Sequence, residues 1–306
     1  MIFAAGLSPA WQQILQFEQL QRGEVNRANE AHWCASGKVI NVGIAAKALG
    51  ARVSLLSTIG GLTGQAIAEE LESLEILTDW VHVEQSTRVC TTILEVDGTT
   101  TELVGNTGSI SDTALDEFIE KFRIHSQVAD VSVLTGSIPA NAGNEYYANL
   151  IRHLPGRFIL DIRGEGLIQT LPYCPFLVKP NREELEQTVG SKLNTSEEIL
   201  DAMQTLNGWG AQWVVVSNGP ENLLLTSREE AWSFTPPKVQ VVNPIGCGDC
   251  LAAGIAVAVS EGKSIPEAVI IGISAATLNA LQLLPAKVQR DQSAVIAGQV
   301  VSEQLI

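Results

Sequence analysis

The feature that most constrains the fold is a regular alternation of strand-like and helix-like segments from about residue 128 onward. The strand-like runs are rich in Val, Ile, Leu and Phe: VSVLTGS, RFILDIRG, FLVKPN, QWVVVSNG and NLLLTS. Between them lie NEYYANLIRHL, REELEQTVG and SEEILDAMQTLNGWG, with apolar residues at helical spacing and acidic residues near their starts. This pattern predicts an α/β fold with a mostly parallel sheet covered by helices on both faces. Ligands of such sheets bind at the carboxyl ends of the strands.

The first hundred residues depart from this pattern and predict a separate small sheet. AKALGARVSLLSTIG is typical of a helix followed by a strand. In contrast, ILQFEQLQRGEVNRANEAHWC and VHVEQSTRVCTTILEVDGTTTELV are typical of β-hairpins with turns at Gly23 and at Asp97–Gly98. We predict one domain over residues 1–306, with lid strands inserted at about 10–36 and 82–105.

Composition excludes several classes of function. Apolar residues make up 45% of the 306 residues, charged residues make up 17%, and the formal net charge is −15. This composition favours a compact protein over a disordered one, and the negative charge argues against nucleic acid or an anionic membrane as partner. The chain shows no signal peptide and no apolar run long enough to span a membrane. Five cysteines, an odd number, favour reduced thiols and a cytoplasmic location.

A glycine-rich turn stands just before a helix near the end of the chain. The sequence NPIGCGDCLAAG, residues 243–254, places Asp249 where the turn meets the predicted helix. Helix N-termini favour negative charge, so Asp249 is either a plain helix cap or a carboxylate that acts on an anion bound in the turn. The pair Cys247 and Cys250 stands at a strand–helix junction, the placement of thioredoxin-like redox motifs, but it occurs late in a long chain with Gly248 and Asp249 between the cysteines. It also lacks the second cysteine pair of a zinc site. A thiol at a helix start nevertheless predicts an acidic, oxidation-sensitive Cys247.

Three segments together resemble the PfkB family of ribokinase-like carbohydrate kinases. They are SGKVINVGIAAKALG (36–50), VKPNREEL (178–185) and the GCGD turn, and they occur in the family's order over essentially the whole chain. The resemblance implies a ribokinase-like, doubly wound α/β core with a small β lid. It also implies ATP-dependent phosphoryl transfer to a sugar hydroxyl, with Asp249 as general base. The N–H groups of Gly246, Cys247 and Gly248 would stabilise the transferring phosphoryl group.

The resemblance also implies a nucleotide site with Mg²⁺. Asn181 and Glu184, three residues apart, would support Mg²⁺ largely through water. The implied nucleotide-binding residues are Lys179, Asn181, Ser217, Gly219 and Asn279. For Asn279, a buried polar residue on a helix is an equally good interpretation.

On the acceptor side, the chain resembles the branch that contains 1-phosphofructokinase and tagatose-6-phosphate kinase. Arg27, Lys38 and Arg88 match basic positions of that branch and would hold the phosphate of a ketohexose phosphate. Their alternative role is ordinary surface charge. The other implied substrate-binding residues are Gln12, Gly37, Asn41 and Ser137.

The acceptor side also departs from the family. Gln12 stands where the family has an aspartate that forms hydrogen bonds with sugar hydroxyls. Ser36 and Val39 stand at positions where the family usually has glycine. Two other functions therefore stay open: a kinase of an unphosphorylated sugar or nucleoside-like substrate, and a catalytically poor sugar- or nucleotide-binding regulator. Exposed lid strands, together with the resemblance, predict a homodimer joined through the lid.

Overall fold

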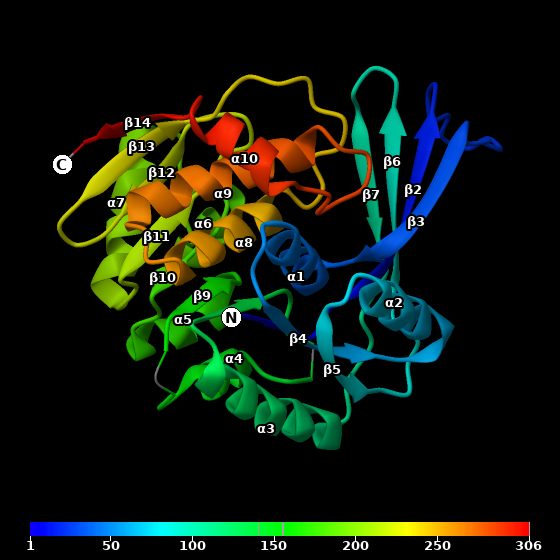
Figure 1. Ribbon diagram of the computed structural model, residues 1–306, viewed down its shortest axis with the longest axis horizontal. Helices are drawn as coiled ribbons and strands as arrows, with labels where there is room; N and C mark the ends of the chain where they lie inside the picture. The colour runs from blue at the N-terminus through cyan, green and yellow to red at the C-terminus, as the bar shows by residue number, and fades with distance from the viewer. Residues whose placement is uncertain (140, 155, 306) are drawn as a thin grey trace.

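The computed structural model describes residues 1–139, 141–154 and 156–305, and these residues form a larger and a smaller sheet (Figure 1). The larger sheet has the strand order β14-β13-β12-β11-β10-β9-β8-β1-β4-β5. From β5 to β11 each strand is parallel to its neighbours, whereas β12, β13 and β14 continue the sheet in antiparallel fashion. The strands are β1 (Ile2–Gly6), β4 (Val53–Ile59), β5 (Leu77–His82), β8 (Val131–Thr135), β9 (Phe158–Asp161), β10 (Leu177–Val178), β11 (Trp213–Val216), β12 (Leu223–Thr226), β13 (Ala231–Thr235) and β14 (Val301–Gln304).

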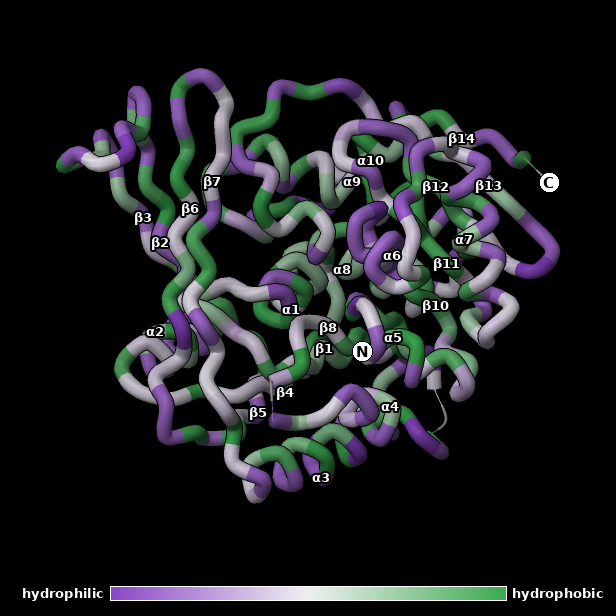
Figure 2. The backbone as a smooth tube through the Cα atoms, turned by 180° about the vertical axis from the view of Figure 1, so that it is seen from behind, coloured by the Kyte–Doolittle hydropathy of each residue, from purple (hydrophilic) through white to green (hydrophobic). Residues whose placement is uncertain are grey.

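Helices cover both faces of this sheet, as the alternating pattern predicts. In β1, Ile2 and Ala4 pack into one core, whereas Phe3 and Ala5 pack into the other. The first core also receives α1 (Lys38–Ala48), α2 (Gly61–Ser73), α8 (Cys247–Ser260), α9 (Ile265–Ala280) and α10 (Arg290–Ala297). The second receives α3 (Asp112–Val128), α4 (Tyr146–Ile151), α5 (Gly164–Thr170), the 3-10 turn η1 (Leu171–Tyr173), α6 (Arg182–Val189) and α7 (Ser196–Trp209). Figure 2 shows the hydropathy alternating along α3, as expected for a helix that covers a sheet.

The smaller sheet is the predicted lid, and it projects from the core beside α1 and α2 (Figure 1). Its strands are β2 (Ala10–Phe17), β3 (Glu30–Ser36), β6 (Val89–Glu95) and β7 (Thr100–Val104), in the order β3-β2-β6-β7. Both hairpins form, and Gly98, with φ +89°, lies in the tight turn between β6 and β7. His82 ends β5 in the larger sheet, so the second pair of lid strands begins at Val89. That the whole chain is one domain stays a prediction.

The topology brings several strand ends to one edge of the larger sheet. The parallel strands β8, β9 and β10 end at Thr135, Asp161 and Val178. The start of α8 lies at the same edge, because a Cβ on Gly248 would lie 3.4 Å from Nζ of Lys179, the residue that follows β10. The rest of α8 packs closely against α9. A Cβ on Gly254 would lie 2.7 Å from the Cα of Gly272. This edge is therefore where the polar segments of the sequence meet.

Candidate active site

The glycine turn before α8 presents Asp249 to the interior of the molecule. Gly246 is the N-cap of α8 and has φ +87°, in the left-handed region that glycine favours. A Cβ at this position would come 3.0 Å from the Cβ of Pro285 and 3.2 Å from Oδ1 of Asn279. Asp249 lies in the first turn of α8 and is only 7% exposed. Because Gly246 occupies the cap position, the plain-cap interpretation of Asp249 is wrong.

The early glycine segment supplies the partner of this carboxylate. Nδ2 of Asn41 donates a hydrogen bond to Oδ2 of Asp249 at 2.7 Å. Oγ of Ser36 donates to Oδ1 of Asn41 at 3.1 Å, which fixes the orientation of the amide. Gly37, with φ +96°, allows α1 to start here, because a Cβ would lie 2.9 Å from the carbonyl oxygen of Ser8. Ser36 departs from the glycine of the resembled family and contributes directly to the position of Asn41.

The pKa of Asp249 is raised from the ordinary value of 3.8 to about 7, first by burial and then by the nearby Asp161 carboxylate. The ammonium groups of Lys38 and Lys179 and the hydrogen bond from Asn41 act in the opposite direction. A carboxyl group with a pKa near neutrality is suited to exchange a proton with a substrate hydroxyl.

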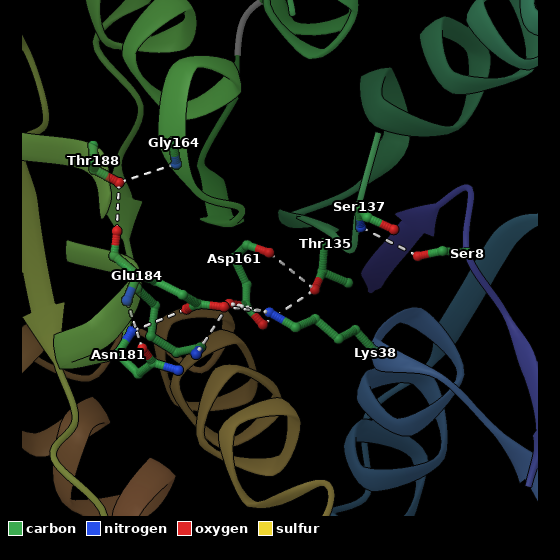
Figure 3. Close-up of polar contacts among 10 residues, drawn as sticks. Ser8, Lys38, Thr135, Ser137, Asp161, Gly164, Asn181, Glu184 and Thr188 are labelled. Carbon is green, nitrogen blue, oxygen red and sulfur yellow. Dashed lines mark hydrogen bonds and ion pairs between the residues drawn. The ribbon is translucent and has the colours of Figure 1, made fainter. Parts of the chain in front are cut away.

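Next to Asp249 lies a charge cluster made of Lys38, Asp161, Lys179 and Glu184. Figure 3 shows three of its members, Lys38, Asp161 and Glu184. Nζ of Lys38 lies 3.2 Å from Oδ1 of Asp161 and 3.2 Å from Oε1 of Glu184. Nζ of Lys179 lies 3.2 Å from the same oxygen of Asp161. Burial disfavours the charged forms of both Asp161 and Lys38. The ammonium groups of Lys179 and Lys38 nevertheless hold the pKa of Asp161 below its ordinary range. Likewise, the nearby carboxylates, that of Asp161 first, raise the pKa of Lys38. Sequence analysis did not identify Asp161 as a site residue, although it ends a strand of the parallel sheet.

The mid-chain segment forms the start of α6. Oδ1 of Asn181 accepts from the N–H of Glu184 at 2.8 Å, and Oε2 of Glu184 accepts from the N–H of Asn181 at 3.0 Å. Asn181 also forms an isolated bridge with Ser217, and Gly219, with φ +57°, follows in the same turn. The structure therefore brings these four residues together at one strand-end region.

Among the described residues, no group of three or more His, Cys, Asp or Glu side chains could hold a metal ion by itself. Glu184 is 8% exposed, and its two carboxylate oxygens contact Lys38 and the backbone of Asn181. This donor set fits a hydrated Mg²⁺ bound mainly to nucleotide phosphates, and it does not fit an ion held by protein ligands alone.

A cavity of about 530 Å³ lies between the base of the lid and the core. It is lined by Arg88, Val104, Gly105, Asn106, Thr107, Gly108, Ser109, Ser137, Ile138 and Pro139. Nη2 of Arg88 donates to the carbonyl oxygen of Ser8 at 3.1 Å. Its Nε atom is buried and has no hydrogen-bond partner within the described part of the chain. Arg88 and Ser137 thus share the cavity, as expected of substrate-binding residues.

The structure places the other predicted acceptor residues in different surroundings. Gln12 is 2% exposed, and its Nε2 donates to Oγ1 of Thr92 at 2.8 Å within the lid. Arg27 is exposed in the loop at the outer end of β2, whereas Arg88 precedes β6 at the inner end (Figure 1). The length of β2 separates these two ends by roughly 20 Å within one chain. Lys38 points to Asp161 and Glu184. The three basic residues predicted to bind one phosphate group together, Arg27, Lys38 and Arg88, therefore lie in three different places.

Asn279 is 1% exposed and ties the glycine turn to the chain after α9. Its Nδ2 donates to the carbonyl oxygen of Ile245 at 2.8 Å, and its Oδ1 accepts from the N–H of Ala286 at 2.7 Å. These contacts favour the interpretation of Asn279 as a buried polar residue of the helix, while its nucleotide contact stays a prediction.

The expectation of an acidic thiol at Cys247 is wrong. Burial, together with the Asp249 carboxylate, raises the pKa of this thiol to about 11. These influences outweigh the hydrogen bond that Asn279 donates to the sulfur and the position at a helix start. All five cysteines of the chain are free.

Within the part of the chain that the structure describes, none of the helices has the length and apolar character needed to cross a membrane.

Comparison with known proteins identifies the family. The model for "pfkB family carbohydrate kinase" matches residues 11–287. The chain is 31% identical to the 1-phosphofructokinase of Bacillus subtilis (strain 168) over 283 residues, which is 92% of each chain. A structure of a "possible 1-phosphofructokinase" from Thermotoga maritima superimposes with a TM-score of 0.92 at 22% identity, covering 100% of this chain and 99% of that one.

A structure of phosphofructokinase-2 from Escherichia coli in complex with fructose-6-phosphate superimposes with a TM-score of 0.88 at 25% identity, covering 97% and 98% of the two chains. A structure of Arabidopsis thaliana ribokinase complexed with ribose and ATP superimposes with a TM-score of 0.76 at 23% identity, covering 97% and 98% of the two chains. These structural matches confirm the expected ribokinase-like α/β fold. Kinases of the matched family use ATP with a divalent metal, generally Mg²⁺. The chain therefore belongs to the pfkB family and is a carbohydrate kinase.

Proposed function

We propose that the protein transfers the γ-phosphoryl group of ATP to a hydroxyl of a ketohexose phosphate of the fructose 1-phosphate or tagatose 6-phosphate type. The observation that carries this proposal is the buried Asp249, held by Asn41 at the glycine turn and with a pKa near neutrality. The 1-phosphofructokinase relatives support a phosphorylated acceptor.

In this proposal Asp249 is the general base that takes the proton of the attacking hydroxyl. The first N–H groups of a helix lack intrahelical partners, so those at the start of α8 face the negative charge of the transferring group. Of the three N–H groups assigned to this role, that of Cys247 donates a long bond of 3.3 Å to the carbonyl oxygen of Pro244. The N–H groups of Gly246 and Gly248 would then contribute more.

The nucleotide phosphates would lie between the start of α6 and the glycine turn. Lys179 would bind them, because a Cβ on Gly248 would lie only 3.4 Å from its Nζ. Asn181 and Glu184 would hold a hydrated Mg²⁺, which supplies charge neutralisation for the phosphates when bound. Ser217, Gly219 and Asn279 complete the proposed nucleotide site.

The phosphorylated acceptor would occupy the cavity under the lid. The guanidinium group of Arg88 lines this cavity, and its Nε has no hydrogen-bond partner among the described residues; Ser137 shares the cavity wall. A phosphate is the kind of group that such a guanidinium would bind. Gln12, Arg27, Gly37, Lys38 and Asn41 are the remaining substrate-binding residues of the proposal.

The protein is further proposed to be a homodimer joined through the lid. Trp33, Val89 and Leu103 are 46%, 38% and 55% exposed, and the rings of Trp11 and Trp33 stack with centroids 6.3 Å apart. Strand alternation puts these residues on one face of the lid sheet, the face opposite Gln12. Sedimentation velocity tests this, and a monomer at all concentrations would contradict it.

The test of the reaction is ADP release with ATP and Mg²⁺ across ketohexose phosphates, free sugars and nucleosides. We expect turnover on a ketohexose phosphate and a kcat lowered at least ~100-fold in Asp249→Asn. Asp79→Asn is the control: it removes a half-buried carboxylate that contacts Lys121 and His125, and it should leave kcat unchanged. Turnover on free sugars or nucleosides alone would contradict the phosphorylated acceptor. Ligand binding without turnover would favour a regulator.

A further inference from the structure

The charge cluster depends on a carboxylate that no motif of the sequence identifies. Asp161 is 1% exposed at the end of β9, and its Oδ1 lies 3.2 Å from Nζ of Lys38 and 3.2 Å from Nζ of Lys179. Its other oxygen accepts from Oγ1 of Thr135 at 3.2 Å (Figure 3). A buried carboxylate in this position is costly unless such partners satisfy it.

The two lysines come from opposite sides of the site. Lys38 starts α1, next to the lid, whereas Lys179 follows β10 and lies beside Gly248 in the glycine turn. Lys179 is 2% exposed, so its ammonium group cannot be solvated in place of its contact with Asp161. A single oxygen atom of Asp161 thus contacts both ammonium groups, and Oε1 of Glu184 is a second partner of Lys38.

We infer that Asp161 is a positioning residue of the kinase, holding Lys38 and Lys179 where the transferred phosphoryl group is to be stabilised. The inference rests on the proposed function. Catalysis of phosphoryl transfer relies on cations placed beforehand, since there is little covalent chemistry for the protein to perform. Asp161 itself does not need to touch the substrates, because it acts through the two ammonium groups.

The alternative is an ion pair that only stabilises the fold. Buried ion pairs often contribute little net stability, so burial alone does not distinguish the two roles. The roles differ in their effect on kcat, which an ion pair that only stabilises the fold would leave unchanged in a folded variant. The cluster also sets the electrostatic surroundings of Asp249. Asp249 is faced by Asp161 from β9, by Lys38 and Asn41 from α1, by Lys179 after β10, and by Cys247 and Cys250 from α8. Of these, Asp161 is the anion that disfavours the charged form of Asp249.

The first experiment is a double-mutant cycle of Asp161→Asn and Lys38→Met, with kcat and KM measured for ATP and for the acceptor that the wild type turns over. We expect Asp161→Asn to lower kcat roughly 100-fold with smaller changes in KM. The double variant should lose about as much kcat as Asp161→Asn alone, because that substitution already releases Lys38. Additive losses, or a loss confined to the unfolding temperature, would overturn the inference.

The second experiment needs no substrate and is independent of the proposed function. The pKa of the Asp249 carboxyl is measured by ¹³C NMR in the wild type and in Asp161→Asn, with Asp249→Asn to assign the signal. The Asp161 carboxylate acts on Asp249 more strongly than either lysine, so removing this anion should lower the pKa of Asp249. An unchanged pKa would contradict the placement of Asp161 beside Asp249 and would overturn the inference. A wild type with no kinase activity but with the expected fall in pKa would contradict only the proposed function.

If Asp161→Asn does not fold, Thr135→Val provides the same test with less disturbance. This variant keeps the carboxylate and both lysines but removes the hydroxyl that holds Oδ2. We expect kcat to fall about tenfold with KM nearly unchanged, because the variant loses one hydrogen bond to the carboxylate. Unchanged kcat in a folded Thr135→Val would contradict a positioning role for this carboxylate.

Discussion

The glycine-turn side and the lid side of the site differ in how completely their polar groups are paired. On the glycine-turn side, Asp161, Lys179 and Asp249 are 1%, 2% and 7% exposed, and each contacts another member of the site. On the lid side, Arg88 faces a cavity of about 530 Å³ with an Nε that has no partner among the described residues. Under the proposed function, the groups for phosphoryl transfer are thus fixed in advance, whereas Arg88 would complete its contacts when the acceptor binds.

This difference predicts separate kinetic effects for the two regions. Substitutions around the glycine turn disturb groups that act in the transition state, so they should lower kcat. Substitutions at the cavity remove contacts made equally to bound substrate and transition state, so they should raise KM.

The largest effect should come from Gly246→Ala. Gly98 has nearly the same φ, +89° against +87°, but a Cβ there would meet nothing within 4 Å, whereas at Gly246 it would meet Pro285 and Asn279. Both alanines incur a backbone cost of about 1 kcal/mol in the left-handed region. Only Gly246→Ala must also move the turn, so kcat should fall ~100-fold or more, with little change in Gly98→Ala. Equal kcat values for the two variants would contradict the role of the turn.

At the cavity, Arg88→Ala should raise the KM for a phosphorylated acceptor roughly 10- to 100-fold, with kcat and the KM for ATP nearly unchanged. The physical reason is the loss of charge-assisted hydrogen bonds to a phosphate. Arg22→Ala, which removes an exposed arginine of the loop between β2 and β3, is the matched control. An equal change of KM in both variants would indicate a general electrostatic effect and would contradict a specific phosphate contact.

The pH dependence of kcat/KM should report on the glycine-turn side alone. Because a general base must be deprotonated and the pKa of Asp249 is about 7, kcat/KM should fall about tenfold per pH unit below pH 7. Residual activity of Asp249→Asn should lack this dependence. If the fall of kcat/KM below pH 7 persists in Asp249→Asn, the titrating group belongs to the substrate or to another residue.

The same pKa predicts a change in stability. The folded-state pKa of Asp249 lies above its unfolded value of 3.8, so the folded protein binds the proton more tightly. This contribution to stability is present below about pH 4 and is lost as the pH rises to about 7. Asp249→Asn should therefore raise the unfolding temperature more at pH 8 than at pH 5, and the reverse order would contradict a raised pKa.

Sequence reasoning predicted the fold and the position of Asp249 because both depend on local patterns. Strand and helix periodicities and a glycine turn before a helix can be read from neighbouring residues. The role of Asp161 depends on three strand ends and a helix start that are distant in the chain. One indication of this role was present in the sequence. The predicted strand RFILD ends in an aspartate, and parallel sheets bind ligands at the carboxyl ends of their strands.

The directions of long side chains could not be predicted in the same way. Lys38 and Arg88 match basic positions of one branch of the family, but the structure turns Lys38 toward Asp161 and Glu184. Its partners come from β9 and α6, and the sequence near Lys38 contains no sign of them. For Cys247, the position at a helix start was visible in the sequence, but the burial that raises its pKa was not.

The smallest effect should follow a change at Cys247, the one side chain of the turn that the reaction does not require. With a pKa of about 11, roughly one thiol in a thousand is ionised at pH 8, so iodoacetamide should modify it very slowly. The exposed Cys174 should react first, and Cys174→Ser isolates the slower site. Cys247→Ala should keep kcat within about twofold, since the turn uses backbone N–H groups. Rapid modification of Cys247 with loss of activity would mean that binding at the turn depends on this thiol, and that the turn is less rigid than its contacts indicate.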